Sequence, residues 1–107
     1  MAKRSKFTLA FALEAVEHLD RVDAKYHNLL QQTIKEQLTH TPTKETRNRK
    51  SLDQPAPFGA AWELRRGPDN RFRVFYEVDP AAYEVQILAI GVKDHSRLLI
   101  GGEEYES

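Results

Sequence analysis

Three arginines surround a predicted turn in the middle of the chain. Arg65 ends a strand-like run that begins at Trp62, and Arg71 and Arg73 follow the turn at residues 66–70. Strands joined by a tight turn pair antiparallel, so we expect the three guanidinium groups on the open face of one hairpin. Clustered guanidinium groups repel one another unless an anion or an acidic partner lies between them. The spacing therefore predicts a phosphate-binding or carboxylate-binding surface. The alternative is pairing with acidic residues of the same face, namely Glu63, Glu77 and Glu84.

The charge of the chain is unevenly distributed, although its sixteen basic and sixteen acidic residues balance. Residues 44–73 hold eight basic and four acidic side chains, a net charge of +4. Residues 74–107 hold two basic and seven acidic ones, a net charge of −5, and we expect residues 102–107 to form an acidic, solubilising tail. A basic middle predicts contact with a polyanion, and a solvated loop is the alternative. The neutral whole argues against unspecific, purely electrostatic binding to nucleic acid.

The sequence excludes several other classes of site. The chain has no cysteine, and its histidines at positions 18, 27, 40 and 95 show no metal-ligand spacing. It contains neither a glycine-rich phosphate loop before a helix nor a nucleophile elbow. We therefore expect no metal and no cofactor. No apolar run approaches the ~18 residues of a membrane span and no secretory signal is evident, so a cytoplasmic protein is expected.

The elements that must position these side chains follow from hydrophobic periodicity. A length of 107 residues predicts a single domain, covering residues 1–107. Alternation predicts a short strand over residues 7–11, and helical spacing predicts a helix ending near Asp20. A second helix begins after Asp23 as N-cap and stops at Thr41-Pro42, which predicts a helical hairpin. Residues 43–61 show no period, and three strands follow at 62–65, 72–78 and 83–90.

The three predicted strands have one apolar and one polar face. The apolar face, which the helices should cover, holds Trp62, Leu64, Phe72, Val74, Tyr76, Val85 and Ile87. The open face displays Glu63, Arg65, Arg71, Arg73, Glu77, Glu84 and Gln86. The predicted fold class is α+β, with a short N-terminal strand and a helical hairpin packed on one face of a small antiparallel sheet.

Three motifs in this order resemble the RelE/ParE superfamily of toxins from bacterial toxin–antitoxin modules. They are Trp62-Glu63-Leu64-Arg65, then Arg71-Phe72-Arg73-Val74-Phe75-Tyr76-Glu77-Val78, then Ile87-Leu88-Ala89-Ile90-Gly91-Val92-Lys93. The resemblance runs roughly from Phe7 to Leu98. It implies a strand, a helical hairpin and an antiparallel sheet. In the RelE branch it also implies metal-independent cleavage of mRNA, by attack of a ribose 2′-OH on the adjacent phosphate.

The resemblance also implies which residues form the site. Arg65, Arg73 and Lys93 match the family's basic residues on the sheet, and we expect them to bind the reacting phosphate. RNA-binding residues are expected at Arg47, Arg49, Lys50 and Arg71. Leu98 or Leu99 stands where RelE has a tyrosine, so the acid/base group is expected to be His95, with Tyr105 as a second choice.

Three functions stay open at this point. The first is an mRNA endoribonuclease toxin that acts on ribosome-bound message. The second is a ParE-like toxin that inhibits DNA gyrase without cleaving RNA. The third is an inactive module that only binds an antitoxin. All three imply a cognate antitoxin as partner, and the first adds mRNA and the ribosome. We expect an amphipathic antitoxin helix on an apolar groove and an acidic antitoxin stretch on Arg65 and Arg73.

Overall fold

The computed structural model describes residues 6–106, so most of the basic N-terminal start examined for a secretory signal lies outside the described residues. Within that range the chain forms two α-helices, three short 3₁₀ turns and seven strands. In chain order these are β1 (Thr8–Phe11), α1 (Leu13–Asp20), η1 (Ala24–Tyr26), α2 (His27–Leu38), β2 (Arg49–Ser51), η2 (Pro57–Gly59), β3 (Trp62–Arg66), η3 (Pro68–Asn70), β4 (Phe72–Asp79), β5 (Glu84–Asp94), β6 (Arg97–Ile100) and β7 (Glu103–Glu104).

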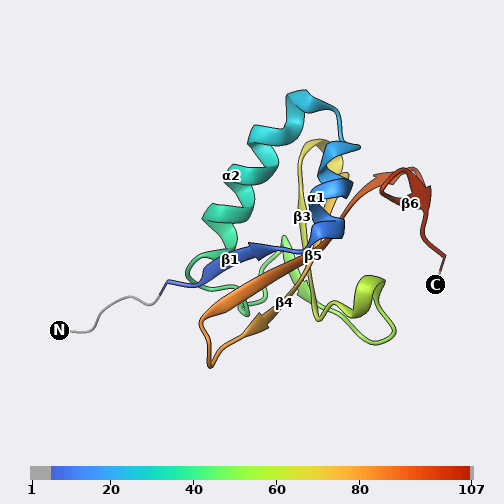
Figure 1. The fold of residues 1–107 in the computed structure, drawn as a ribbon. Helices are drawn as coiled ribbons and strands as arrows, with labels where there is room; N and C mark the ends of the chain where they lie inside the picture. Colours follow the sequence, from blue (N-terminus) through green and yellow to red (C-terminus); the bar gives the residue numbers. More distant parts are fainter. Residues whose placement is uncertain (1–5, 107) are drawn as a thin grey trace.

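The seven strands form one sheet in the order β2-β3-β4-β5-β6-β7, with β1 added beside β5 (Figure 1). Neighbouring strands run antiparallel except β1 and β5, which run parallel. The long strand β5 pairs with β4 along one edge. Its other edge pairs with β1 at residues 84–87 and with β6 at residues 91–94. The architecture confirms the predicted α+β class and the predicted order of strand, helical hairpin and sheet.

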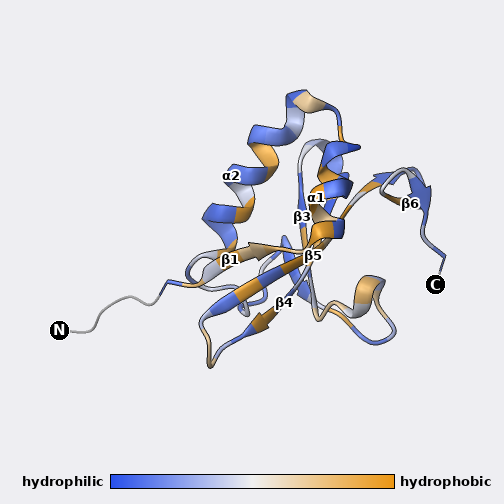
Figure 2. Cartoon of the chain, in the orientation of Figure 1, coloured by the Kyte–Doolittle hydropathy of each residue, from blue (hydrophilic) through white to orange (hydrophobic). Residues whose placement is uncertain are grey.

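Both α-helices lie on one face of the sheet (Figure 1), and Figure 2 shows apolar positions recurring along α2. The second helical segment starts where the sequence predicts, because the Asp23 side chain accepts a hydrogen bond from the Lys25 N–H at 3.2 Å. Residues Leu30, Ile34 and Leu38 recur every four positions on α2 and are fully buried. No helix within residues 6–106 is long and apolar enough to cross a membrane.

The main core lies between these helices and the sheet. All seven residues predicted for the apolar sheet face belong to it, with Trp62 only partly buried: Trp62, Leu64, Phe72, Val74, Tyr76, Val85 and Ile87. The ring of Tyr76 stacks on that of Trp62 with centroids 6.2 Å apart. The phenol of Tyr76 donates a hydrogen bond to the Pro42 carbonyl at 2.7 Å. Burial raises the pKa of Tyr76, which keeps this donor protonated.

A β-bulge decides which residues of β5 face the helices. The register shifts between Phe75 and Tyr76, and Leu88 is the extra residue on β5. Side chains alternate along a regular strand, so an extra residue exchanges the two faces beyond it. Ile87 and Ile90 therefore both enter the main core although they are three residues apart.

A second, smaller apolar cluster lies on the opposite face of the sheet, centred on Phe75 and Ala89. Its other members are Ala60, Ile100, Leu52, Leu88, Leu98 and Tyr105. The C-terminal residues take part in it, since Glu103–Glu104 pairs with β6 and the Tyr105 N–H donates to the Leu98 carbonyl at 2.8 Å. The prediction of a purely solubilising tail is therefore wrong. Strands β2, β6 and β7 have two to four residues, too few to show a period-two pattern.

His18 binds the edge of β5 between the segment that pairs with β1 and the segment that pairs with β6. The N–H of Ile90 lies outside both ladders and donates to Nδ1 of His18 on α1 at 3.2 Å. Nδ1 can accept this bond only while it carries no proton. Burial lowers the pKa of His18 below its ordinary value of 6.5, and the negative charges of Glu14 and Glu17 partly oppose this effect.

The lowered pKa of His18 predicts a stability that depends on pH. The unfolded chain binds this proton more readily, so the contribution of neutral His18 is complete above pH 6.5 and is lost as the pH falls toward the folded pKa. Urea unfolding should therefore show a lower midpoint at pH 5.5 than at about pH 7.5. In His18→Gln, which keeps an acceptor that does not titrate, we expect a smaller difference. Equal pH dependence in the wild type and in His18→Gln would contradict the attribution of this pH dependence to His18.

Candidate active site

Strand register brings three of the predicted site residues onto the open face of the sheet. Arg65 on β3 lies directly opposite Arg73 on β4, and Arg73 lies opposite Gly91 on β5. Lys93 follows two residues after Gly91 and therefore shares its face. A side chain at position 91 would crowd β6, because an added Cβ would lie 3.0 Å from the Leu99 carbonyl oxygen and would require β6 to shift slightly. The glycine therefore lets β6 pack closely beside the cationic row.

A single carboxylate connects the two arginines. Oε1 of Glu63 accepts a hydrogen bond from Nε of Arg65 at 3.0 Å, and Oε2 accepts one from Nη1 of Arg73 at 3.2 Å. Nε of Arg73 also donates to the Asn70 carbonyl at 3.0 Å, at the turn before β4. Internal pairing with Glu63, the alternative to an external anion, is therefore present. One carboxylate neutralises only one of the two guanidinium charges.

Arg73 and Lys93 line a hollow of about 300 Å³ on this face. Its polar wall consists of Glu63, Arg73, Lys93, Ser96, Arg97 and Glu104. Its apolar wall consists of Leu52, Pro57, Phe75, Leu98 and Tyr105. Arg65 is not among the lining residues and reaches the hollow only through Glu63. The polar wall holds three cations and two carboxylates, so it keeps one positive charge in excess. Such a wall beside an apolar wall with aromatic rings suits a ligand that carries a phosphate next to a flat ring.

Tyr105 is the residue whose place at the site the sequence analysis underrated. The pairing of β7 with β6 brings the chain back beside Leu98. Tyr105 therefore lines the hollow although it lies near the end of the sequence. A signal was present in the sequence: Gly101-Gly102 separates two strand-like segments, and a glycine pair at such a place is typical of a tight hairpin. Ser96 and Arg97 reach the hollow through the pairing of β6 with β5, at the turn that joins these strands.

His95 is not brought into the hollow. It lies in the two-residue turn between β5 and β6 with a left-handed φ of 57°, and its side chain is 95% exposed. Its nearest ionic contact is with Asp94, at 3.8 Å between Nε2 and Oδ1. The adjacent Ser96 lines the hollow, so His95 stands next to the site with its ring directed into solvent.

Arg71 does not join Arg65 and Arg73 on the open face, contrary to the expected alternation. Asp69 and Asn70 adopt left-handed conformations, and Arg71 itself is helical, so β4 begins only at Phe72. Strand alternation therefore does not extend back to residue 71. Arg71 is exposed and lines a separate hollow beside Tyr26.

Register also separates the basic residues before β3. Lys50 lies opposite Glu63, on the face of the arginine row, and is exposed, as is Arg47. Arg49 lies opposite the buried Leu64 and is itself 6% exposed. Its Nη1 donates to the Gln37 carbonyl at 2.7 Å, and to the carbonyl and the hydroxyl of Thr41. The expected RNA contact of Arg49 does not fit this burial, because its guanidinium binds the Gln37 carbonyl in the last turn of α2 and the Thr41 carbonyl beyond it.

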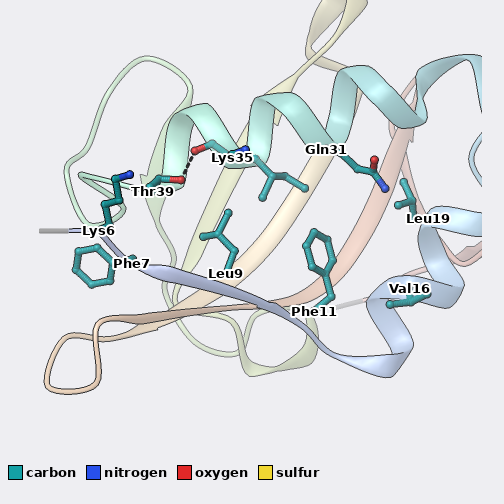
Figure 3. A pocket seen from close by; sticks show the side chains of 10 residues that line it. Lys6, Phe7, Leu9, Phe11, Val16, Leu19, Gln31, Lys35 and Thr39 are labelled. Carbon is teal, nitrogen blue, oxygen red and sulfur yellow. Dashed lines mark hydrogen bonds between the residues drawn. The ribbon is translucent and has the colours of Figure 1, made fainter.

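An apolar groove of about 590 Å³ lies away from this site, between β1, α1 and α2 (Figure 3). Leu9 and Phe11 of β1 point into it, and Val16 and Leu19 of α1 border it (Figure 3). The remaining lining residues are Lys6, Phe7, Gln31, Ile34, Lys35 and Thr39. Phe11 and Val16 are 37% and 43% exposed, which is unusual for large apolar side chains arranged side by side.

Comparison with known proteins identifies the architecture. No model of a known protein family matches the sequence, and no curated protein matches it. Among solved structures, the RelBE2 toxin–antitoxin complex from Mycobacterium tuberculosis aligns with a TM-score of 0.69 and 20% identity, over 87% of this chain and 98% of that chain. The isolated E. coli RelE toxin aligns with a TM-score of 0.59 and 16% identity, over 84% and 87%. The chain has the RelE fold.

The RelE fold confirms, at the level of architecture, the resemblance drawn from the three sequence motifs. Both solved structures align over more than four fifths of this chain, so the likeness covers the helices and the sheet together. Each motif lies in the sheet, on β3, β4 and β5, where the strands are paired in sequence order. At 16–20% identity the shared property is the fold, and the chemistry has to be argued from this chain's own residues.

Proposed function

We propose that this chain is the toxin of a toxin–antitoxin module and cleaves mRNA in the cytoplasm, at the hollow on the open face of its sheet. The observation that carries the proposal is the joint presence of Arg73, Lys93 and Tyr105 around one hollow on a RelE fold. Two cations there can bind a phosphodiester and stabilise the charge that develops on it. The neutral net charge fits a nuclease whose substrate is held partly by the ribosome.

The proposed reaction needs no group beyond the RNA and the protein. The ribose 2′-oxygen forms a bond to the adjacent phosphorus, and the bond from phosphorus to the 5′-oxygen breaks. A base takes the 2′-OH proton and an acid gives a proton to the leaving 5′-oxygen. The products are a 2′,3′-cyclic phosphate and a free 5′-OH. Arg73 and Lys93 neutralise the non-bridging oxygens, whose charge is greatest in the transition state.

Two side chains compete for the role of acid. Tyr105 lines the hollow, so its hydroxyl is the better placed of the two to protonate a leaving oxygen bound there. His95, which the sequence offers in place of the tyrosine that RelE has near Leu98 or Leu99, stands on the neighbouring turn and would have to rotate inward from solvent. We therefore assign the acid to Tyr105 and include both residues in the test. Arg65 contributes to the site through its ion pair with Glu63. The exposed cations Lys50 and Arg47 are available to bind the RNA backbone.

The test is a brief induction of the chain in a bacterial host, followed by mapping of new RNA 5′ ends. One translated message and its untranslated twin are compared. We expect in-frame cuts on the translated message alone, reduced in Tyr105→Phe and retained in His95→Ala. Loss of the cuts in His95→Ala alone would reverse that assignment. Growth arrest without new ends would contradict the nuclease and lead to gyrase supercoiling assays.

We further propose that the antitoxin of this module docks an amphipathic helix in the apolar groove. The groove offers exposed apolar side chains, and two lysines, Lys6 and Lys35, line it as well. A helix with one apolar face and acidic flanks is complementary to both features. The similar Mycobacterium tuberculosis structure contains a toxin together with its antitoxin, which supports a protein partner of this kind.

A charge placed in the groove should separate toxicity from neutralisation. Val16→Asp is expected to leave toxicity intact and to weaken antitoxin binding about 100-fold, because an unpaired carboxylate would be buried against apolar side chains. Leu13→Asp on the same helix is the control, since Leu13 is 73% exposed and does not line the groove. Each variant is co-expressed with the protein encoded by the adjoining reading frame, and growth is followed. Equal rescue of both variants would place the antitoxin elsewhere.

A further inference from the structure

Glu63 is unusual among the acidic residues of the described chain. It is 7% exposed, and no other carboxylate within residues 6–106 is buried. Both of its oxygens are used by cations, one by Arg65 and one by Arg73. Lys50 is its cross-strand neighbour on β2. A carboxylate that bridges two guanidinium groups neutralises positive charge that a phosphate would otherwise meet.

Glu63 leaves other donors of both arginines free. Arg73 uses Nε for the Asn70 carbonyl and Nη1 for Glu63, which leaves Nη2 without a protein partner among residues 6–106. Arg65 gives only its Nε to Glu63, so its two terminal nitrogens also keep their donors. A phosphate that binds either arginine therefore approaches the Glu63 carboxylate that both arginines hold. Phosphate and carboxylate are both anions, so they compete for the same positive charge.

We propose that Glu63 is a specificity-determining competitor for the phosphate of the substrate, an inference that rests on the proposed nuclease site. A phosphodiester at these arginines meets a positive charge that Glu63 has already partly neutralised, so an isolated phosphate gains little electrostatic energy. Only a strand that is also held elsewhere, as a message on the ribosome is, has the additional binding energy that overcomes this opposition. Glu63 thereby discriminates against free RNA and other cellular anions.

The test uses binding, so that it does not depend on turnover. The probe is a short fluorescent single-stranded oligonucleotide of 2′-deoxy nucleotides, which lacks the attacking 2′-OH; inorganic phosphate serves as competitor. We expect Glu63→Gln to bind this probe about tenfold more tightly than the wild-type chain, because the competing charge is gone. The slope of log affinity against log salt should steepen by about 0.7, the contribution of one further phosphate contact on a single strand.

Two matched variants keep the outcome interpretable. Glu77→Gln removes the same charge from an exposed position on β4, and we expect its affinity to stay close to that of the wild type. Glu63→Asp retains the charge and should restore weak binding. Equal or weaker binding by a folded Glu63→Gln protein would overturn the competition and make Glu63 a residue that positions the arginines. Absence of binding of probe and phosphate by every folded variant would overturn the proposed nuclease site as well.

Discussion

Replacing Arg73 by alanine is expected to lower the rate of mRNA cleavage by about 10²–10³-fold, the loss typical of removing one preorganised donor to a developing anion. Arg73 is the only arginine that both lines the hollow and bonds to Glu63 within the described chain. Its side chain is 14% exposed and is held by two hydrogen bonds. A cation fixed in advance loses little entropy on meeting the transition state, which is why its removal should affect the rate strongly.

The measurement is the fraction of message cut per unit time at the mapped sites, with the amount of folded protein checked by circular dichroism. Arg66→Ala is the matched control, because Arg66 is an exposed arginine at the end of β3 whose cross-strand neighbour is Phe72 of the main core. That control should cut at a rate within about twofold of the wild type, since surface changes remote from a site have small effects. Equal losses in the two variants would indicate a general effect of charge and remove Arg73 from the proposed mechanism.

Replacing Arg49 by alanine is expected to destabilise the fold by about 3 kcal/mol, because several charge-assisted hydrogen bonds from a buried guanidinium are lost together. The guanidinium holds the carbonyl of Gln37 at the end of α2 and the carbonyl of Thr41. Proline follows at position 42, and its carbonyl in turn accepts from Tyr76. Arg49 therefore ties the C-terminal end of α2 to the edge of the sheet.

Thermal and urea unfolding of the purified chain check this expectation. A loss of about 3 kcal/mol lowers the midpoint of thermal unfolding by more than 10 °C for a domain of this size. Arg47→Ala, which removes an exposed arginine two residues earlier, should change stability by less than about 0.5 kcal/mol and instead weaken RNA binding. The reverse pattern, with a stable Arg49→Ala chain that binds RNA poorly, would return Arg49 to the RNA-binding surface.

The different burial of Arg49 and Lys50 could not be predicted from the sequence. Both residues belong to one basic run with no hydrophobic alternation, so nothing in their own neighbourhood indicates which of them is buried. The pairing of β2 with β3 decides it, by placing Arg49 opposite Leu64 and Lys50 opposite Glu63. A shift of one residue in that register would exchange their environments.

Some residues of the proposed active site could likewise be predicted from the sequence and others could not. Arg65 and Arg73 could be assigned to one face from the sequence, since a tight turn sets the register of a hairpin and side chains alternate along each strand. Lys93 was assigned only through the resemblance, because alternation from Ile87 would place it on the core face and the bulge at Leu88 brings it to the open face. Tyr105 was only a second choice, because its approach to the hollow depends on two short strands paired far from the turn near residue 70. Arg71 was placed on the wrong face because left-handed residues delay the start of β4.

Local patterns in the sequence predict the α+β class, the helical hairpin, the three strands that follow residue 61 and the apolar face they share. These features depend on periodicity and on turn residues, which act between neighbours a few positions apart. Other features appear only in the folded chain: Leu88 forms a bulge, Glu63 is shared between two arginines, and the C-terminal segment returns to the sheet. Each of these depends on pairing between distant segments, whose free energy includes loop closure and burial that no local pattern records.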